Sequence, residues 1–241
     1  GLDPLVRREF LESMIDVAAE GRSVLLSSHQ VGEVERVADD VIVLMNGRVV
    51  AHERLEDLKK SVTEVYAAAS VSQSWTPILK EECDKVGIHF FTSPYDYDSI
   101  EHVNPYIPAF KAGSGEIDWI EALVHMASKG KPMIIACGAA DIADVQRAVH
   151  AILKVNKQLC IMQCNTNYTA SPNNYDHLHL NVLKTFAAMF PDVILGLSDH
   201  THSVAPVLGA VTMGARMIER HFTDSNDREG PDHKFAMNPA N

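Results

Sequence analysis

Short apolar segments alternate with helical segments from about residue 72 to the end of the chain, and this rhythm limits the possible folds most strongly. Each apolar segment has the length of a buried strand, and each intervening segment places apolar residues at helical spacing. The alternation predicts parallel strands joined by right-handed crossovers, as in an α/β barrel or a doubly wound sheet. The predicted strands are residues 89–92, 109–112, 133–137, 159–164, 193–197 and 217–222, and the predicted helices are 74–86, 117–129, 141–155, 179–190 and 203–214.

The length of this region sets the expected number of strands. At about 30 residues per strand-and-helix unit, roughly 170 residues accommodate about six units, whereas a closed barrel has eight strands and about 250 residues. If the region is a barrel, we therefore expect an incomplete one.

A different pattern precedes it. Residues 5–20 have helical periodicity, 23–28 form an apolar strand pattern, and 33–38 suggest a second helix. Asn46-Gly47 lies between two further strand patterns and is a strong hairpin signal. We expect a small α/β segment here, with a junction near residue 70.

Charge and composition exclude several functions. The net charge of −11 disfavours nucleic acid as a partner, since phosphate binding requires a basic face. No apolar run reaches the roughly 18 to 20 residues of a membrane span, and the N-terminus has no signal-peptide pattern, so we expect a cytoplasmic protein. The four cysteines show no Cys-x-x-Cys spacing and are interpreted as reduced thiols, most of them in the core.

Two histidines occupy positions suited to metal binding. His200 and His221 each lie at or close to the C-terminal end of an apolar strand, the edge at which α/β barrels build their sites. Because neighbouring strands are about 4.8 Å apart, both imidazoles can reach one ion. Imidazole favours manganese, iron, cobalt or zinc over magnesium. Two hydrogen-bonded histidines without a metal are an equal alternative on spacing alone.

Other polar residues follow the predicted strands. A lysine and a hydroxyl in FKAGSGE suit a phosphate or carboxylate, and the glutamate suits a hydroxyl-rich substrate or proton transfer. Each residue alone is better explained as a loop residue that caps the next helix. Five strand ends that carry such groups together favour a site. The residues are Ser93, Lys111, Ser114, Glu116, Thr166 and Tyr168.

Residues 72–241 resemble the N-acetylneuraminate (sialic acid) synthase family. The resemblance rests on FFTSPYD, FKAGSGE, GLSDHT, ERHFTD and REGPDHKFAMNP, in this order. It implies a TIM-type (β/α) barrel that condenses phosphoenolpyruvate with an N-acyl hexosamine, such as N-acetylmannosamine, with a divalent metal. Manganese is expected, and magnesium, cobalt or zinc are alternatives. The implied metal ligands and catalytic residues are His200 and His221, with Lys111 and Glu116 also catalytic. The implied substrate-binding residues are Ser93, Lys111, Ser114 and Ser198 for phosphoenolpyruvate, and Glu116, Tyr168 and Asp232 around the amino sugar. Thr166 is also expected to bind substrate.

The chain also departs from this family's pattern. Ala136 stands where a serine is common, and Thr166 where some members have asparagine. We expect a barrel without its first two strands, which would bring a glutamate and a lysine. We also expect no C-terminal antifreeze-like domain, which lends an arginine to a partner subunit, although a homodimer stays open.

Residues 1–65 resemble the C-terminal part of an ABC-transporter ATPase domain. GLDP corresponds to the D-loop with Asp3, and His29 to the switch histidine. The phosphate-binding G-x-x-x-x-G-K-[ST] motif is absent, so Asp3 and His29 are interpreted as a vestigial nucleotide site. Three hypotheses follow: a synthase of small-molecule substrates, an inactive chimeric fusion, or an ATP-binding transporter subunit, the last disfavoured by the missing motifs.

Overall fold

The computed structural model describes residues 40–45, 48–54, 71–168, 171–230 and 232–240. The chain divides into two compact units, residues 1–71 and 72–241. In the first unit, strand β1 (Asp40–Met45) pairs antiparallel with β2 (Arg48–Arg54), the hairpin that Asn46-Gly47 predicts. The predicted helices 5–20 and 33–38 and the predicted strand 23–28 lie outside the described residues.

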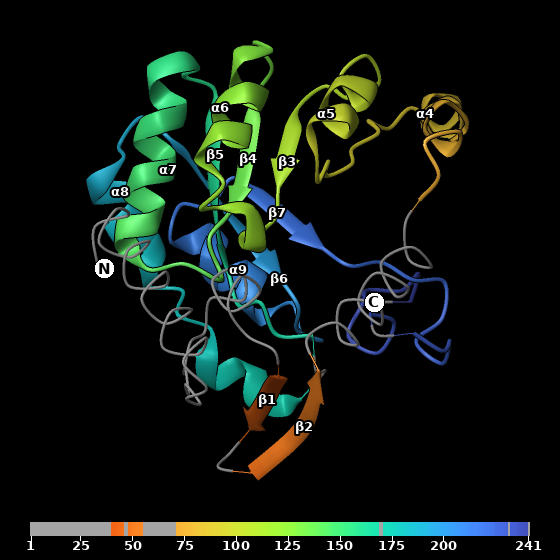
Figure 1. Ribbon diagram of the computed structural model, residues 1–241, viewed down its shortest axis with the longest axis vertical. Helices are drawn as coiled ribbons and strands as arrows, with labels where there is room; N and C mark the ends of the chain where they lie inside the picture. The colour runs from red at the N-terminus through yellow and green to blue at the C-terminus, as the bar shows by residue number, and fades with distance from the viewer. Residues whose placement is uncertain (1–39, 46–47, 55–70, 169–170, 231, 241) are drawn as a thin grey trace, which may run out of the picture. The chain divides into compact units, whose positions relative to one another are not determined.

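The second unit contains a parallel sheet of five strands in the order β3-β4-β5-β6-β7 (Figure 1). Strand order follows chain order, as successive right-handed crossovers require. Five of the six predicted strands are thereby confirmed, and β5 has the predicted bounds. The strands are β3 (Phe110–Ala112), β4 (Met133–Ala136), β5 (Leu159–Cys164), β6 (Ile194–Asp199) and β7 (Met217–Arg220).

The predicted strand at residues 89–92 does not form, so the expectation of about six strands was one too high for the described residues. Residues 88–95 run without regular structure between two helices. An apolar run becomes a strand only where a neighbour offers backbone groups for a ladder. Here β3 pairs with β4 alone. Phe90 is nevertheless buried, so the apolar pattern correctly indicated burial.

Most of the helices connect consecutive strands of the sheet along the chain, and all five predicted helices are found. Local signals set their ends: Asp141 caps α7 through the backbone N–H groups of Ala143 and Asp144, and Gly87 ends α4 at a φ of 75°. Helix α5 and two short 3₁₀ helices were not predicted. The α-helices are α4 (Trp75–Val86), α5 (Tyr97–Val103), α6 (Ile120–Ser128), α7 (Ile142–Val155), α8 (Val182–Met189) and α9 (Ala205–Thr212), and the 3₁₀ helices are η1 (Ser114–Glu116) and η2 (Pro172–His177).

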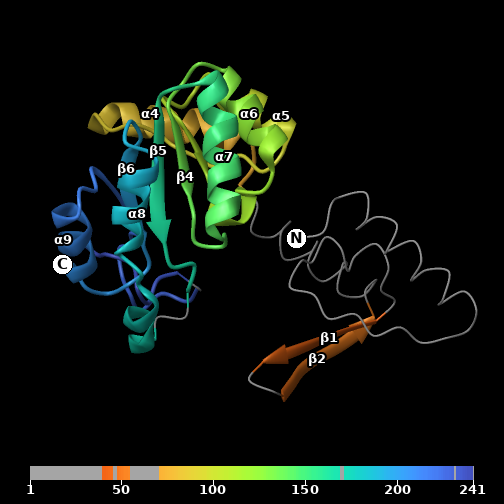
Figure 2. The same ribbon diagram turned by 90° about the vertical axis from the view of Figure 1, so that its left-hand side faces the viewer.

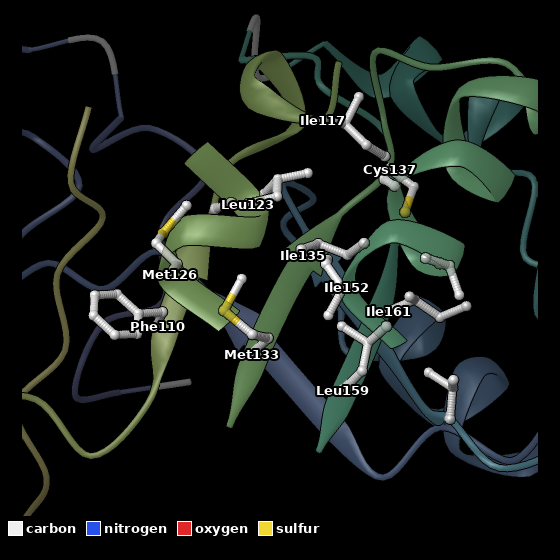
Figure 3. Close-up of a cluster of buried hydrophobic side chains, with 14 of the residues drawn as sticks. Phe110, Ile117, Leu123, Met126, Met133, Ile135, Cys137, Ile152, Leu159 and Ile161 are labelled. Atoms are coloured by element: carbon white, nitrogen blue, oxygen red, sulfur yellow. The ribbon is translucent and has the colours of Figure 1, made fainter. Parts of the chain in front are cut away.

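The helices α6 to α9 cover one face of the sheet, called here the outer face (Figures 1 and 2). Residues that alternate along each strand point into this layer, so Met133 and Ile135 of β4 face the helices together with Leu159 and Ile161 of β5. Figure 3 shows them packed beside Leu123 of α6. This layer is the main hydrophobic core. None of the described helices combines the length and apolar character needed to cross a membrane.

The opposite, inner face has a smaller apolar cluster that extends along β4 and β5. It contains Ile134 and Ala136 of β4 and Cys160, Met162 and Cys164 of β5. Burial raises the pKa of the Cys160 thiol to about 12, and that of Cys137 likewise to about 12. Both thiols are therefore protonated at neutral pH, in agreement with reduced core cysteines.

The contact between β6 and β7 leaves no space at Gly196. A Cβ there would lie 2.9 Å from the carbonyl oxygen of Met217 and 3.0 Å from Cγ of Met162. We predict that Gly196→Ala lowers the free energy of unfolding by about 1–3 kcal/mol, the usual cost of overpacking. Urea denaturation measures this. Gly115→Ala is the control, because a Cβ at Gly115 meets no atom within 4 Å, and an equal loss in both variants would contradict the prediction.

Candidate active site

Polar side chains replace the apolar ones where the inner face reaches the C-terminal ends of the strands. Side chains alternate between faces along a strand, so Leu197 and Ile218 face the helices while Ser198 and Glu219 face inward. His200 and His221 follow two residues later on the same side. The register pairs Ser198 with Glu219, which brings the two histidines to the same edge.

The two histidines lie side by side in an aromatic cluster. Their ring centroids are 5.1 Å apart. Tyr168 lies 4.4 Å from the His200 ring, and Phe235 lies 5.1 Å from the His221 ring, both measured between centroids. His200 and Phe235 are buried, whereas 30% of the His221 side chain is exposed. The expected convergence of the two imidazoles is therefore found in the structure.

Hydrogen bonding determines which nitrogen of each ring is free. His200 Nδ1 lies 3.0 Å from the carbonyl oxygen of Asn165. A carbonyl only accepts, so Nδ1 of His200 carries the proton and Nε2 keeps its lone pair. His221 Nδ1 lies 3.4 Å from Oδ2 of Asp232, which favours the same tautomer. A carboxylate or carbonyl behind the ring is the usual support of a metal-binding histidine.

Burial favours the neutral rings. It is the largest effect on both, and it lowers the pKa of His200 and of His221 below the ordinary histidine value. The Asn165 carbonyl opposes this at His200, and the charge of Asp232 opposes it at His221. Neutral imidazole is the form that binds metals. Among the described residues no three His, Cys, Asp or Glu side chains could together hold an ion.

A positive charge lies on the same face. Lys111 Nζ is 3.3 Å from Oε1 of Glu219, and Ser198 Oγ donates a hydrogen bond of 2.9 Å to the same oxygen. Only 15% of the Lys111 side chain is exposed, against 41% for Glu219. The three residues come from β3, β6 and β7, so this contact joins both edge strands of the sheet to β6.

Two further predicted residues meet at the ends of β3, β4 and β5. Ser114 Oγ accepts a hydrogen bond of 3.0 Å from the backbone N–H of Gly138. A Cβ on Gly138 would lie 2.1 Å from Oγ1 of Thr166, so the two loops are in close approach. Ala136, one of the two departures from the family pattern, stands two residues before Gly138 at the end of β4 and is buried in the inner cluster. These loops thus bring together the buried hydroxyl of Ser114, the exposed Thr166 and a glycine backbone.

The remaining predicted residues lie at different distances from the histidines. Glu116 is in η1, where a Cβ on Gly113 would come within 2.5 Å of its Oε2. Ser93 is half-buried in the segment that connects α4 to α5. Asp232 and Tyr168 contact the histidine pair directly. Asp3 and His29 lie outside the described residues, so the nucleotide site stays a prediction.

Sequence reasoning missed several members of the site. Glu219 stands two residues before His221 on one strand, so the period of two alone would have placed it beside the histidine. Asp199 and Arg220, which form a buried ion pair behind the histidines, could have been found in the same way. Phe235 lies in the segment REGPDHKFAMNP, but no periodicity indicated that its ring contacts the histidines, because this segment is irregular.

Residues 36–241 match the model of the NeuB family, and the chain belongs to this family. The match begins within residues 1–65, the segment for which an ABC-ATPase fragment was expected, and that expectation stays a prediction. The chain spans about half the length of the curated relatives it matches. It is 32% identical over 164 residues to human N-acetylneuraminate-9-phosphate synthase. The aligned residues make up 67% of this chain and 45% of the human protein.

Two other relatives agree with the family. N,N'-diacetyllegionaminic acid synthase of Legionella pneumophila is 33% identical over 182 residues, or 73% of this chain and 50% of that protein. The crystal structure of the spore coat polysaccharide biosynthesis protein SpsE of Bacillus subtilis superposes with a TM-score of 0.65 at 34% identity, over 71% of this chain and 48% of that one. The described sheet is therefore a parallel half-barrel of a NeuB-type fold.

The hydrogen bonds at Nδ1 of the two histidines lead to a prediction about their tautomers. We expect both His200 and His221 to carry the proton on Nδ1 at pH 8, with Nε2 unprotonated. ¹⁵N NMR of the metal-free protein distinguishes the tautomers, and His200→Ala and His221→Ala assign the signals. Exposed His89 serves as an internal reference. A proton on Nε2 of either ring would contradict the arrangement described here.

Proposed function

We propose that the protein is a synthase that condenses phosphoenolpyruvate with an N-acyl hexosamine to give a nonulosonic acid and phosphate. The observation that carries the proposal is the pair of neutral imidazoles beside Lys111, Ser198 and Glu219 on one strand edge. Membership of the NeuB family and the activities for which its relatives are named support it. The family is established by the sequence match, and the reaction and its substrates are what we propose.

His200 and His221 would hold the divalent metal through their Nε2 atoms. Two imidazoles fit manganese, cobalt or zinc better than magnesium, and we propose manganese. When bound, the ion supplies Lewis-acid polarisation of an aldehyde oxygen. Asn165 and Asp232 hold the rings in the required tautomer. Tyr168 and Phe235 exclude water from one side of the pair.

The other residues would hold phosphoenolpyruvate. Lys111 supplies the positive charge, and Glu219 with Ser198 fixes the direction of its ammonium group. Ser114, Thr166 and the open backbone at Gly138 suit phosphate or carboxylate oxygens. We propose that Glu116, Asp232 and Tyr168 bind the hydroxyls and amide of the sugar and that Ser93 contacts phosphoenolpyruvate. Positioning two substrates in this way accounts for a large part of catalysis.

The reaction balances as follows. Carbon 3 of phosphoenolpyruvate bonds to the aldehyde carbon, and the aldehyde oxygen takes a proton to become a hydroxyl. Water adds to carbon 2 and gives up that proton. The carbon–oxygen bond to phosphate then breaks, phosphate leaves with the electron pair and with the second proton of the water, and carbon 2 becomes a ketone. No oxidant or reductant is required.

The sugar is the open part of the proposal. The relatives are named for N-acetylneuraminate 9-phosphate, for diacetyllegionaminic acid, for pseudaminic acid and for spore coat polysaccharide. A nine-carbon acid formed with the three carbons of phosphoenolpyruvate requires a six-carbon aldehyde, and we propose an N-acyl hexosamine. A panel of such sugars, with and without 6-phosphate, identifies the preferred one.

The test is binding of phosphoenolpyruvate together with phosphate release. We expect calorimetry to show phosphoenolpyruvate binding that Lys111→Met weakens at least about tenfold, because a charge-assisted contact is lost. Phosphate release should require the sugar and stop when EDTA removes the metal. Lys184→Met, on the exposed side of α8, is the matched control. Equal phosphoenolpyruvate binding in wild type and Lys111→Met would contradict the proposed function.

A further inference from the structure

We propose that Asp199 and Arg220 are positioning residues that fix the separation and orientation of His200 and His221. The inference rests on the proposed function in that it treats the two histidines as metal ligands. By alternation along the strands, Asp199 and Arg220 lie on the outer face of the sheet, behind the two histidines. Neither residue faces the substrates, so neither is a catalytic residue.

The ion pair lies directly behind the histidines in the chain. Arg220 Nε is 3.2 Å from Oδ2 of Asp199, and the exposed fractions of the two side chains are 8% and 0%. The two residues are register partners on β6 and β7. Each is followed immediately by one of the histidines. The ion pair therefore joins the two strands at the last position before the site.

Arg220 also binds the chain on the far side of His200. Its Nη2 donates to the carbonyl oxygen of Thr201. Thr201 in turn donates two hydrogen bonds of 3.1 Å to the Asp199 carboxylate, from its backbone N–H and from Oγ1. His200 is thus held between two residues that are both bound to Arg220, and Arg220 is bonded covalently to His221. The guanidinium makes these contacts from two nitrogens held in a rigid plane, whereas a lysine offers one nitrogen on a flexible stem.

A second side-chain contact links β6 and β7 on the inner face, at the register pair that precedes Asp199 and Arg220. Ser198 Oγ donates to Oε1 of Glu219 across the same two strands. Two cross-strand contacts on opposite faces therefore precede the histidines and oppose both a slip and a rotation of the strand ends. Alternation of side chains is what makes this possible, because consecutive residues face opposite sides.

The cost of burying charge supports a positioning role. Apolar residues of similar volume often replace a buried ion pair without loss of stability, so such a pair is weak evidence of a stabilising function. The main core of the outer face is apolar, and Leu197 and Ile218 occupy it on the same two strands. A charged pair at the next position therefore needs an explanation, and the directional bonds around His200 provide one.

The experiment compares Arg220→Lys and Thr201→Val with the wild-type full chain. The first readout is the NOE between the rings of His200 and His221 in the metal-free protein, since the centroids are 5.1 Å apart. The second is the affinity for Mn²⁺ by EPR. We expect Arg220→Lys to weaken the ring–ring NOE and to lower Mn²⁺ affinity about 10- to 100-fold, as for other residues that support metal ligands. Thr201→Val removes one hydroxyl contact and should have a smaller effect of the same kind.

Ile152→Val is the control for general destabilisation. Ile152 is fully buried in α7 and remote in sequence from the strand ends. It should lower the melting temperature and leave NOE and Mn²⁺ affinity unchanged. Unchanged values in Arg220→Lys and Thr201→Val, or equal losses in Ile152→Val, would overturn the positioning role. If Arg220→Lys does not fold, Thr201→Val decides. A wild type with the NOE but without Mn²⁺ binding would refute the proposed metal, and the NOE in the variants would still test the positioning.

Discussion

The parallel register between β6 and β7 is the constraint on which the rest of the site depends. It pairs Ser198 with Glu219 and Asp199 with Arg220, so the next inward residue of each strand end is a histidine. A shift of one residue would turn every side chain to the other face. The close contact at Gly196 and the two cross-strand bonds hold this register, which makes the histidine pair a consequence of sheet geometry.

Burial then gives the pair its chemistry. Aromatic neighbours and the sheet withdraw the imidazoles from water, and this lowers the pKa of both. The Asn165 carbonyl and the Asp232 carboxylate place the remaining proton on Nδ1. Neutral rings with a free Nε2 result at physiological pH. Lys111 lies on the same face, so the imidazole pair and a positive charge share one edge of the sheet.

The parts of the fold and site that follow local rules could be predicted from the sequence. Periodicity identified β3 to β7 and the main helices, and the strand-end rule identified His200 and His221. The prediction of a strand at residues 89–92 was wrong, because a strand also requires a partner backbone and periodicity does not report one. Glu219 was missed although alternation indicated it. Phe235 was beyond prediction, because its place beside His221 depends on the path of an irregular segment.

We propose that β6 and β7 present one metal site formed by His200 and His221. Anomalous diffraction from crystals soaked in Mn²⁺ would locate the bound ion. We expect a peak within bonding distance of Nε2 of both rings, with the remaining ligands supplied by water or substrate. A peak bound to Nδ1, a peak elsewhere in the chain, or rings turned to opposite faces of the sheet would contradict it.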